Sequence, residues 1–229
     1  MIKKIWNIIL TVLLLGVVIT TGFLWQEKEF MATTGENTLT VVIDPGHGGR
    51  DPGKEGVNGV LEKDINLAIA LYLKECYERE GINVILTRTE DVGLYEEDDN
   101  NKKTSDMKKR CEIVENAKPD IVISIHQNSY IDEAVNGAQV FHYEGSENGR
   151  KLATYIQNRL GLIEGMNKRP VKANNEYYIL RNTSFPTVIV ECGFLSNKME
   201  AGLLCDEEYQ QSVANAIFMG TLDFLKTND

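Results

Sequence analysis

Cysteine is scarce in this chain of 229 residues, and no two of its four cysteines form a CxxC pair. The sequence therefore specifies no disulfide framework, even for a protein outside the cytoplasm, where disulfides persist. We interpret all four as small buried hydrophobic side chains. They are Cys76, Cys111, Cys192 and Cys205.

An excess of basic residues is also missing. The chain has 24 Lys and Arg against 34 Asp and Glu, a net charge of −10. This balance argues against binding to nucleic acid or to another anionic surface through bulk electrostatics. One local basic cluster is interpreted as a solvated helix face beside the acidic run 96–99. Its members are Lys102, Lys103, Lys108 and Lys109.

Long uncharged runs are absent except at the N-terminus, where Ile5 to Trp25 form 21 residues without a charge. As a helix, this run spans roughly 30 Å, the thickness of a bilayer's hydrocarbon core. Lys3 and Lys4 precede it, so the rest of the chain is expected outside the cytoplasmic membrane. We predict a membrane anchor in residues 1–25. A cleaved signal peptide is the alternative, which would leave a secreted protein.

The remaining sequence shows neither a second domain nor an internal repeat. After a polar linker in 26–37, apolar strand patterns alternate with helical ones through residues 38–229, which predicts a single α/β domain. We expect a mixed, mainly parallel, twisted sheet of about six strands flanked by helices, with a long loop at 88–103. The expected strands are 38–43, 82–86, 120–125, 137–143, 177–180 and 187–190, and the expected helices are 62–80, 104–116, 149–160 and 207–225.

Three potential metal or catalytic side chains stand at or just past the carboxyl ends of apolar strands: His47, His126 and Glu191. In an open α/β sheet, these ends are where ligands and catalytic groups collect. Glu62 follows a glycine-rich loop that can fold back toward His47. Two imidazoles and one carboxylate satisfy a zinc ion and leave one position for water, while a second carboxylate can move a proton. The pattern indicates a zinc hydrolase.

Each of these residues also has a structural alternative. A carboxylate such as Glu62 is favoured at a helix N-terminus by the helix dipole alone. A lone histidine is more often hydrogen-bonded in the fold than bound to metal. His126 ends a strongly apolar strand, and Glu191 follows another, so an unpartnered polar group there would be costly. His142 has no motif around it, and we expect it to be structural or at the surface.

The glycine-rich loop lacks the GxxxxGK[ST] and GxGxxG patterns of phosphate-binding loops. It belongs instead to a set of four segments that occur in a characteristic order along the chain. These are His47-Gly48-Gly49 with Pro52-Gly53, Gly56 and Gly59 to Leu61-Glu62-Lys63; Ser124-Ile125-His126-Gln127-Asn128; Leu180-Arg181 with Pro186; and Val190-Glu191-Cys192-Gly193-Phe194-Leu195-Ser196-Asn197.

In these segments the chain resembles the zinc-dependent N-acetylmuramoyl-L-alanine amidase family of cell-wall hydrolases, across about residues 39–225. The resemblance implies a six-stranded mixed sheet, zinc held by His47, Glu62 and His126, and Glu191 as the catalytic acid and base. It also implies the substrate, the amide between the lactyl group of N-acetylmuramic acid and L-alanine in peptidoglycan. Asn128 and Arg181 are candidates for substrate contacts.

The layout, a membrane segment followed by a bare catalytic domain, is similar to that of the family's spore-cortex amidases. This likeness implies a role in spore cortex maturation, in which the stripped glycan becomes muramic lactam. The absence of a wall-binding module leaves room for an activating protein partner. Two rivals stay open: a zinc peptidase that cuts within the stem peptide, and a non-catalytic wall-binding protein that keeps the fold.

Overall fold

The computed structural model of the protein describes residues 39–227. The predicted membrane segment in 1–25 and the linker in 26–37 lie outside these residues. Within the described part of the chain, no helix combines the length and the apolar character needed to cross a membrane.

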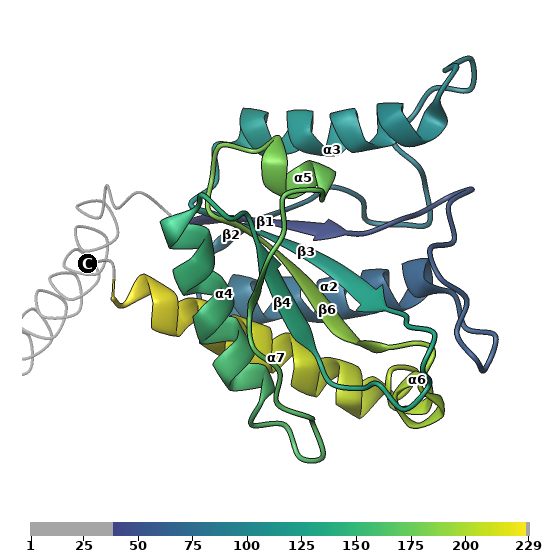
Figure 1. Cartoon of the computed structure of the whole chain (residues 1–229). Helices are drawn as coiled ribbons and strands as arrows, with labels where there is room; N and C mark the ends of the chain where they lie inside the picture. Colours follow the sequence, from purple (N-terminus) through teal and green to yellow (C-terminus); the bar gives the residue numbers. More distant parts are fainter. Residues whose placement is uncertain (1–38, 228–229) are drawn as a thin grey trace, which may run out of the picture. The chain divides into compact units, whose positions relative to one another are not determined.

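A six-stranded mixed sheet forms the centre of the fold, as the alternating pattern predicts (Figure 1). The strand order is β2-β1-β3-β6-β4-β5. The first four strands in this order run parallel, β4 is antiparallel to β6, and β5 is parallel to β4. The strands are β1 (Thr40–Pro45), β2 (Asn83–Leu86), β3 (Ile121–Asn128), β4 (Gln139–His142), β5 (Lys172–Ala173) and β6 (Thr187–Phe194).

Helices cover both faces of the sheet. Those named α2, α4 and α7 pack together on one face, while α3 and α5 lie on the other (Figure 1). The helices are α2 (Glu62–Arg79), α3 (Lys102–Ala117), α4 (Glu147–Leu160), α5 (Tyr178–Arg181), α6 (Lys198–Leu203) and α7 (Glu207–Leu225).

The central strands are apolar on both faces, which places them in the interior of the domain. In β1, Val41 and Ile43 belong to the main core beneath α2 and α7, whereas Val42 packs in a smaller cluster on the α3 face. The same alternation occurs in β3, where Ile123 joins the main core and Val122 the smaller cluster. Because both faces are covered, polar side chains of these strands gather at the strand ends.

The strand expected at 177–180 is wrong: these residues form the short helix α5, and the sixth strand is β5. Asn174 explains the difference, because its side-chain oxygen accepts hydrogen bonds from the backbone N–H groups of Glu176 and Tyr177 and starts a turn. Ile179 and Leu180 are then buried in a cluster on the α3 face. Tertiary packing thus overrides the β preference of this aromatic and branched segment.

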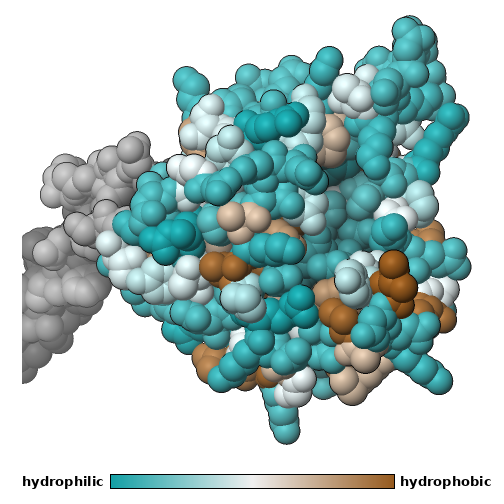
Figure 2. Space-filling view, viewed as in Figure 1, coloured by the Kyte–Doolittle hydropathy of each residue, from teal (hydrophilic) through white to brown (hydrophobic). Residues whose placement is uncertain are grey.

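The expectation for the cysteines holds only in part. Cys111 and Cys192 are buried, but Cys76 is half-buried and Cys205 is exposed, and all four are free thiols. Cys205 follows α6, where a turn brings it to the surface instead of into the core. The interpretation of all four as buried hydrophobic residues is therefore wrong for Cys205. Exposed apolar side chains of α6, such as Met199, lie in the same region, where Figure 2 shows several hydrophobic surfaces.

Candidate active site and metal centre

The loop after β1 places His47 at the carboxyl end of the parallel strands. Its backbone has φ of 62°, a left-handed conformation that is uncommon outside glycine. The neighbouring glycines leave space that a side chain would fill. A Cβ at Gly46 would lie 2.2 Å from the His126 ring, and one at Gly53 would lie 2.5 Å from Glu62 Oε2. The glycine-rich loop thus wraps closely around the predicted metal-binding residues.

Glu62 is the first residue of α2, and only 2% of its surface is exposed. Its Oε1 lies 3.2 Å from His47 Nε2 and 3.0 Å from His126 Nδ1. The backbone N–H of Gln127 donates to Oε1 at 3.1 Å, and that of Lys54 donates to Oε2 at 2.8 Å. The carboxylate is therefore held between the two imidazoles. Stabilisation by the dipole of α2 alone would not require this position.

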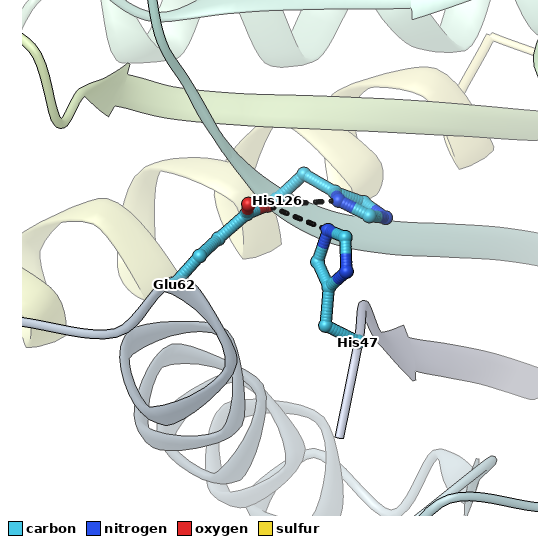
Figure 3. Close-up of side chains that lie close together, drawn as sticks. All are labelled: His47, Glu62 and His126. Carbon is cyan, nitrogen blue, oxygen red and sulfur yellow. Dashed lines mark hydrogen bonds and ion pairs between the residues drawn. The ribbon is translucent and has the colours of Figure 1, made fainter. Parts of the chain in front are cut away.

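His126 lies near the carboxyl end of β3, two residues before Asn128, and completes the group. Figure 3 shows the two imidazoles and the Glu62 carboxylate pointing toward one another from β3, the β1 loop and the start of α2. One donor atom from each residue can be chosen so that all three lie within 4.8 Å of one another. The structure thus brings together His47, Glu62 and His126, the three residues that the sequence analysis names as metal ligands.

The charges in this group favour a bound cation. Burial opposes ionisation of Glu62, yet hydrogen bonds and charge from His126 and His47 hold its pKa well below the usual range. For His47, burial disfavours the charged form, but the hydrogen bond and charge of Glu62, together with Asp51, raise the pKa. A buried carboxylate that stays ionised needs positive charge beside it, either a proton on imidazole or a metal ion in its place.

Asp51 is a contributor that the sequence analysis missed. Its Oδ2 lies 2.9 Å from Nδ1 of His47, on the side of the ring opposite Glu62. A carboxylate in this position favours an orientation of the ring that leaves Nε2 directed into the group, as in many metal-bound histidines. In the sequence, the only indication of this contact was that Asp51 follows His47 by four residues within a turn-rich loop.

Glu191 lies on β6 beside His126, with which it pairs in the sheet register. It is 6% exposed, and burial raises its pKa to about 7, although the His126 imidazole opposes this increase. Tyr177 donates a 3.3 Å hydrogen bond to Oε1, whereas Oε2 has no hydrogen-bond partner within residues 39–227. A buried carboxyl oxygen without a partner is costly in an apolar setting and common at catalytic positions.

Two buried arginines donate hydrogen bonds to the backbone carbonyls of the His47 loop. Arg110 of α3 forms an ion pair with Asp44, with Nη1 2.7 Å from Oδ1, and its Nη2 donates to the His47 carbonyl at 2.6 Å. Arg88 donates to the carbonyls of Pro45 and Gly46 at 3.0 and 3.1 Å. These contacts were also missed, because nothing in the sequence distinguishes a buried arginine from a surface one.

The site opens into a cavity of about 780 Å³, lined by the β1 loop, the carboxyl ends of β3 and β6, and parts of α3 and α5. Asn128 lines this cavity, where its Oδ1 accepts a hydrogen bond from Ser129 N. Arg181 is exposed and does not contribute to the lining. His142 is buried in β4 with Nδ1 2.9 Å from the Tyr143 carbonyl, in agreement with a structural role.

Comparison with known proteins agrees with this geometry. The family model Amidase_3, described as N-acetylmuramoyl-L-alanine amidase, matches residues 41–222. The germination-specific N-acetylmuramoyl-L-alanine amidase of Bacillus subtilis is 34% identical over 187 residues, which cover 80% of this chain and 78% of the relative.

Among solved structures, the CwlD amidase from Clostridioides difficile, in complex with the GerS lipoprotein, has 39% identity and a TM-score of 0.80. The match covers 82% of this chain and 99% of that one. The amidase AmiC2 of Nostoc punctiforme has 34% identity and a TM-score of 0.74, over 84% of this chain and 99% of its own. The chain therefore belongs to the N-acetylmuramoyl-L-alanine amidase family, whose members hydrolyse the amide between N-acetylmuramic acid and L-alanine in peptidoglycan.

Proposed function

We propose that this amidase uses a single zinc ion held by His47, Glu62 and His126, with Glu191 as its acid and base. One observation supports this assignment: the three metal-ligand atoms lie close together, and Oε2 of the neighbouring Glu191 has no hydrogen-bond partner among the described residues. The donor set fits zinc, because two imidazoles and one carboxylate are a frequent catalytic combination that leaves a position open. Asp51 lies within ion-pair distance of the His47 ring on the opposite side.

A bound zinc ion would supply a Lewis acid that acidifies water and stabilises negative charge on the substrate carbonyl oxygen. Glu191 takes the proton of the attacking water through Oε2, while Tyr177 holds Oε1. The same carboxyl group returns the proton to the departing nitrogen, since an amine anion is a very poor leaving group. A pKa near neutrality suits a group that must both accept and donate a proton.

We further propose that the enzyme acts outside the cytoplasmic membrane, anchored by the apolar segment 5–25, in spore cortex maturation or germination. The germination-specific relative in Bacillus subtilis and the similarity to CwlD support this role. That CwlD was solved in complex with a lipoprotein supports an accessory protein for this chain also. To test whether the enzyme needs such a partner, the zinc-dependent activity of the full-length chain is measured with and without the lipoprotein.

Mass spectrometry of digested peptidoglycan tests the chemistry. The zinc-loaded protein should release stem peptides that begin with a free L-alanine amine and leave an intact lactyl acid. The Glu191→Ala variant should fold and bind zinc but release none. Shortened peptides still attached to glycan would instead identify the zinc peptidase rival, and peptidoglycan binding without any product would favour the non-catalytic one.

Metal analysis tests the ligands separately from turnover. His126→Ala should retain its fold, as judged by circular dichroism, and lose bound zinc. His142→Ala is the matched control, because this histidine lies in β4 away from the cavity lining. Full zinc occupancy in His126→Ala would remove His126 from the ligand set.

A further inference from the structure

Asn66 is a buried polar residue of α2 whose side chain contacts the chain neighbours of both proposed histidine ligands. Its exposed fraction is 0%. Its Nδ2 donates a 3.1 Å hydrogen bond to the carbonyl of Gly46, the residue before His47. Its Oδ1 accepts a 3.1 Å hydrogen bond from Nε2 of Gln127, the residue after His126. One side-chain amide therefore bridges the two segments that carry the imidazoles.

The third ligand, Glu62, stands one turn before Asn66 on the same helix. Nδ2 of Asn66 lies 3.5 Å from Oε1 of Glu62, which is long for a hydrogen bond. The backbone N–H of Gln127 donates to the same oxygen at 3.1 Å. Figure 3 shows that the three ligands come from the loop after β1, the start of α2 and β3. Asn66 belongs to one of these segments and forms hydrogen bonds with the other two.

A polar residue at this position is not explained by the helix or by the core. Asparagine is a weaker helix former than leucine, and a buried amide is costly unless it is hydrogen-bonded. Both polar atoms of the Asn66 side chain have partners, so this cost is offset. Asn66 does not line the catalytic cavity and therefore does not touch the substrate. Its contacts are directed to the segments that hold the ligands.

Gln127 needs this support because the sheet is irregular where it lies. The pairing of β3 with β6 shifts in register between His126 and Asn128, so the regular ladder does not hold Gln127. Its side chain forms a hydrogen bond with the buried Cys192 thiol, a weak partner, and its Oε1 has no hydrogen-bond partner within residues 39–227. The bond to Asn66 is therefore the strongest contact of this side chain.

We propose that Asn66 is a positioning residue of the metal centre, which holds the His47 loop and the His126 strand at the separation that lets both imidazoles and Glu62 bind one ion. This inference rests on the proposed function, because it concerns the zinc ion assigned to the same site. Hydrogen-bond partners behind metal ligands typically change metal affinity by about 10- to 100-fold. The alternative is a purely stabilising role, in which Asn66 ties α2 to the sheet without affecting metal affinity.

Chelator competition on the full-length protein tests the proposal through the zinc Kd. Asn66→Leu removes the amide at similar volume and should bind zinc at least about tenfold more weakly, while circular dichroism shows a native fold. The visible absorption of bound cobalt(II), which depends on the geometry of its ligands, should also change. Gln127→Met keeps the backbone bond to Glu62 and should weaken zinc binding by a smaller factor. The double variant should match Asn66→Leu to within about twofold, because Gln127 acts through Asn66.

Tyr77→Phe is the matched control. Tyr77 is also a fully buried residue of α2, and the variant removes a 2.7 Å hydrogen bond to Oγ1 of Thr221, away from the site. It should lower the stability to urea in the presence of EDTA. Its zinc Kd and cobalt(II) spectrum should equal those of the wild type.

Unchanged zinc affinity and cobalt(II) spectra in folded Asn66→Leu and Gln127→Met would overturn the positioning role. An equal loss of affinity in Tyr77→Phe would do the same, because affinity would then follow stability alone. If Asn66→Leu does not fold, Gln127→Met decides the question by the presence or absence of its loss. A wild type that binds no zinc would instead refute the metal assignment of the proposed function, so the two failures are distinguishable.

Discussion

Replacing Arg110 with methionine should destabilise the fold and weaken metal binding together. The guanidinium is fully enclosed, with only 2% of its side chain exposed, and it forms an ion pair with Asp44 at 2.7 Å. Removing one partner of a buried ion pair costs about 3–5 kcal/mol, a large part of a typical domain's stability. The variant also loses a hydrogen bond to the His47 carbonyl.

The same ion pair affects the pKa of Asp44. Burial alone would raise the pKa of Asp44, but the charge of Arg110 and hydrogen bonds from Ser124 and Thr87 outweigh it and lower this pKa from 3.8 to about 2. A shift of this size corresponds to about 2 kcal/mol of stability. Because the folded-state pKa is the lower one, this contribution is present above about pH 4 and is lost as the pH falls toward 2.

Urea unfolding in the presence of EDTA measures the effect without a contribution from metal. At pH 7, Arg110→Met should lower the free energy of unfolding by about 3–5 kcal/mol. On an Asp44→Asn background the same change should cost at least about 1 kcal/mol less, because only Asp106, and no longer Asp44, then loses its ion-pair partner. Arg150→Met is the control, since its exposed pair with Glu147 contributes under about 1 kcal/mol. A penalty equal to that of Arg150→Met, or an additive double variant, would refute the reasoning.

Three further predictions concern the site and the thiols. Gly53→Ala should weaken zinc binding at least tenfold, as measured by chelator competition, because the new Cβ would lie 2.5 Å from Glu62 Oε2. Gly59→Ala is the control and should bind zinc normally, since Gly59 also has a positive φ but no described atom within 4 Å of a new Cβ. Zinc at 1,000 times its Kd should stabilise the wild type by about 4 kcal/mol in thermal unfolding, a gain that His126→Ala should lack. The exposed Cys205 should react with a thiol reagent in the native state, whereas Cys192, buried with a raised pKa, should react only after unfolding.

The sequence contains enough information to predict the sheet and the core of the site. Strands such as β1 and β3 begin as apolar, β-branched runs, with His47 two residues after the end of β1 and His126 two residues before the end of β3, so their carboxyl ends could be located. β5 could not be found, because it is only two polar or small residues long, Lys172 and Ala173. The short helix α5 was missed because its turn depends on the side chain of Asn174, which precedes the segment itself.

Contacts between distant segments account for the rest of what could not be predicted. Glu62 alone is indistinguishable from any carboxylate that stabilises a helix N-terminus, and only the fold brings it to 3.0 Å from His126. Likewise, the basic cluster interpreted as a solvated helix face divides in the structure. Lys102 and Lys103 line the cavity, whereas Lys108 and Lys109 do not. The division follows from position along α3, because only its first residues reach the cavity. There they lie with Arg50 and Lys54, which come from a loop about 50 residues earlier in the chain.

The left-handed backbone of His47 explains why this site needs two buried arginines. A non-glycine residue in this conformation costs of order 1 kcal/mol or more, and it persists only when surrounding contacts enforce it. Arg88 and Arg110 together bind the carbonyls of three consecutive residues, Pro45, Gly46 and His47, from a strand end and a helix on either side. The backbone that carries the imidazole is therefore held in place by residues more than 40 positions away in the sequence. A short sequence motif is enough to identify His47 as a ligand, whereas the position of this histidine depends on the assembled fold. A residue such as Arg110, which binds the His47 carbonyl, should therefore affect metal affinity as well as stability.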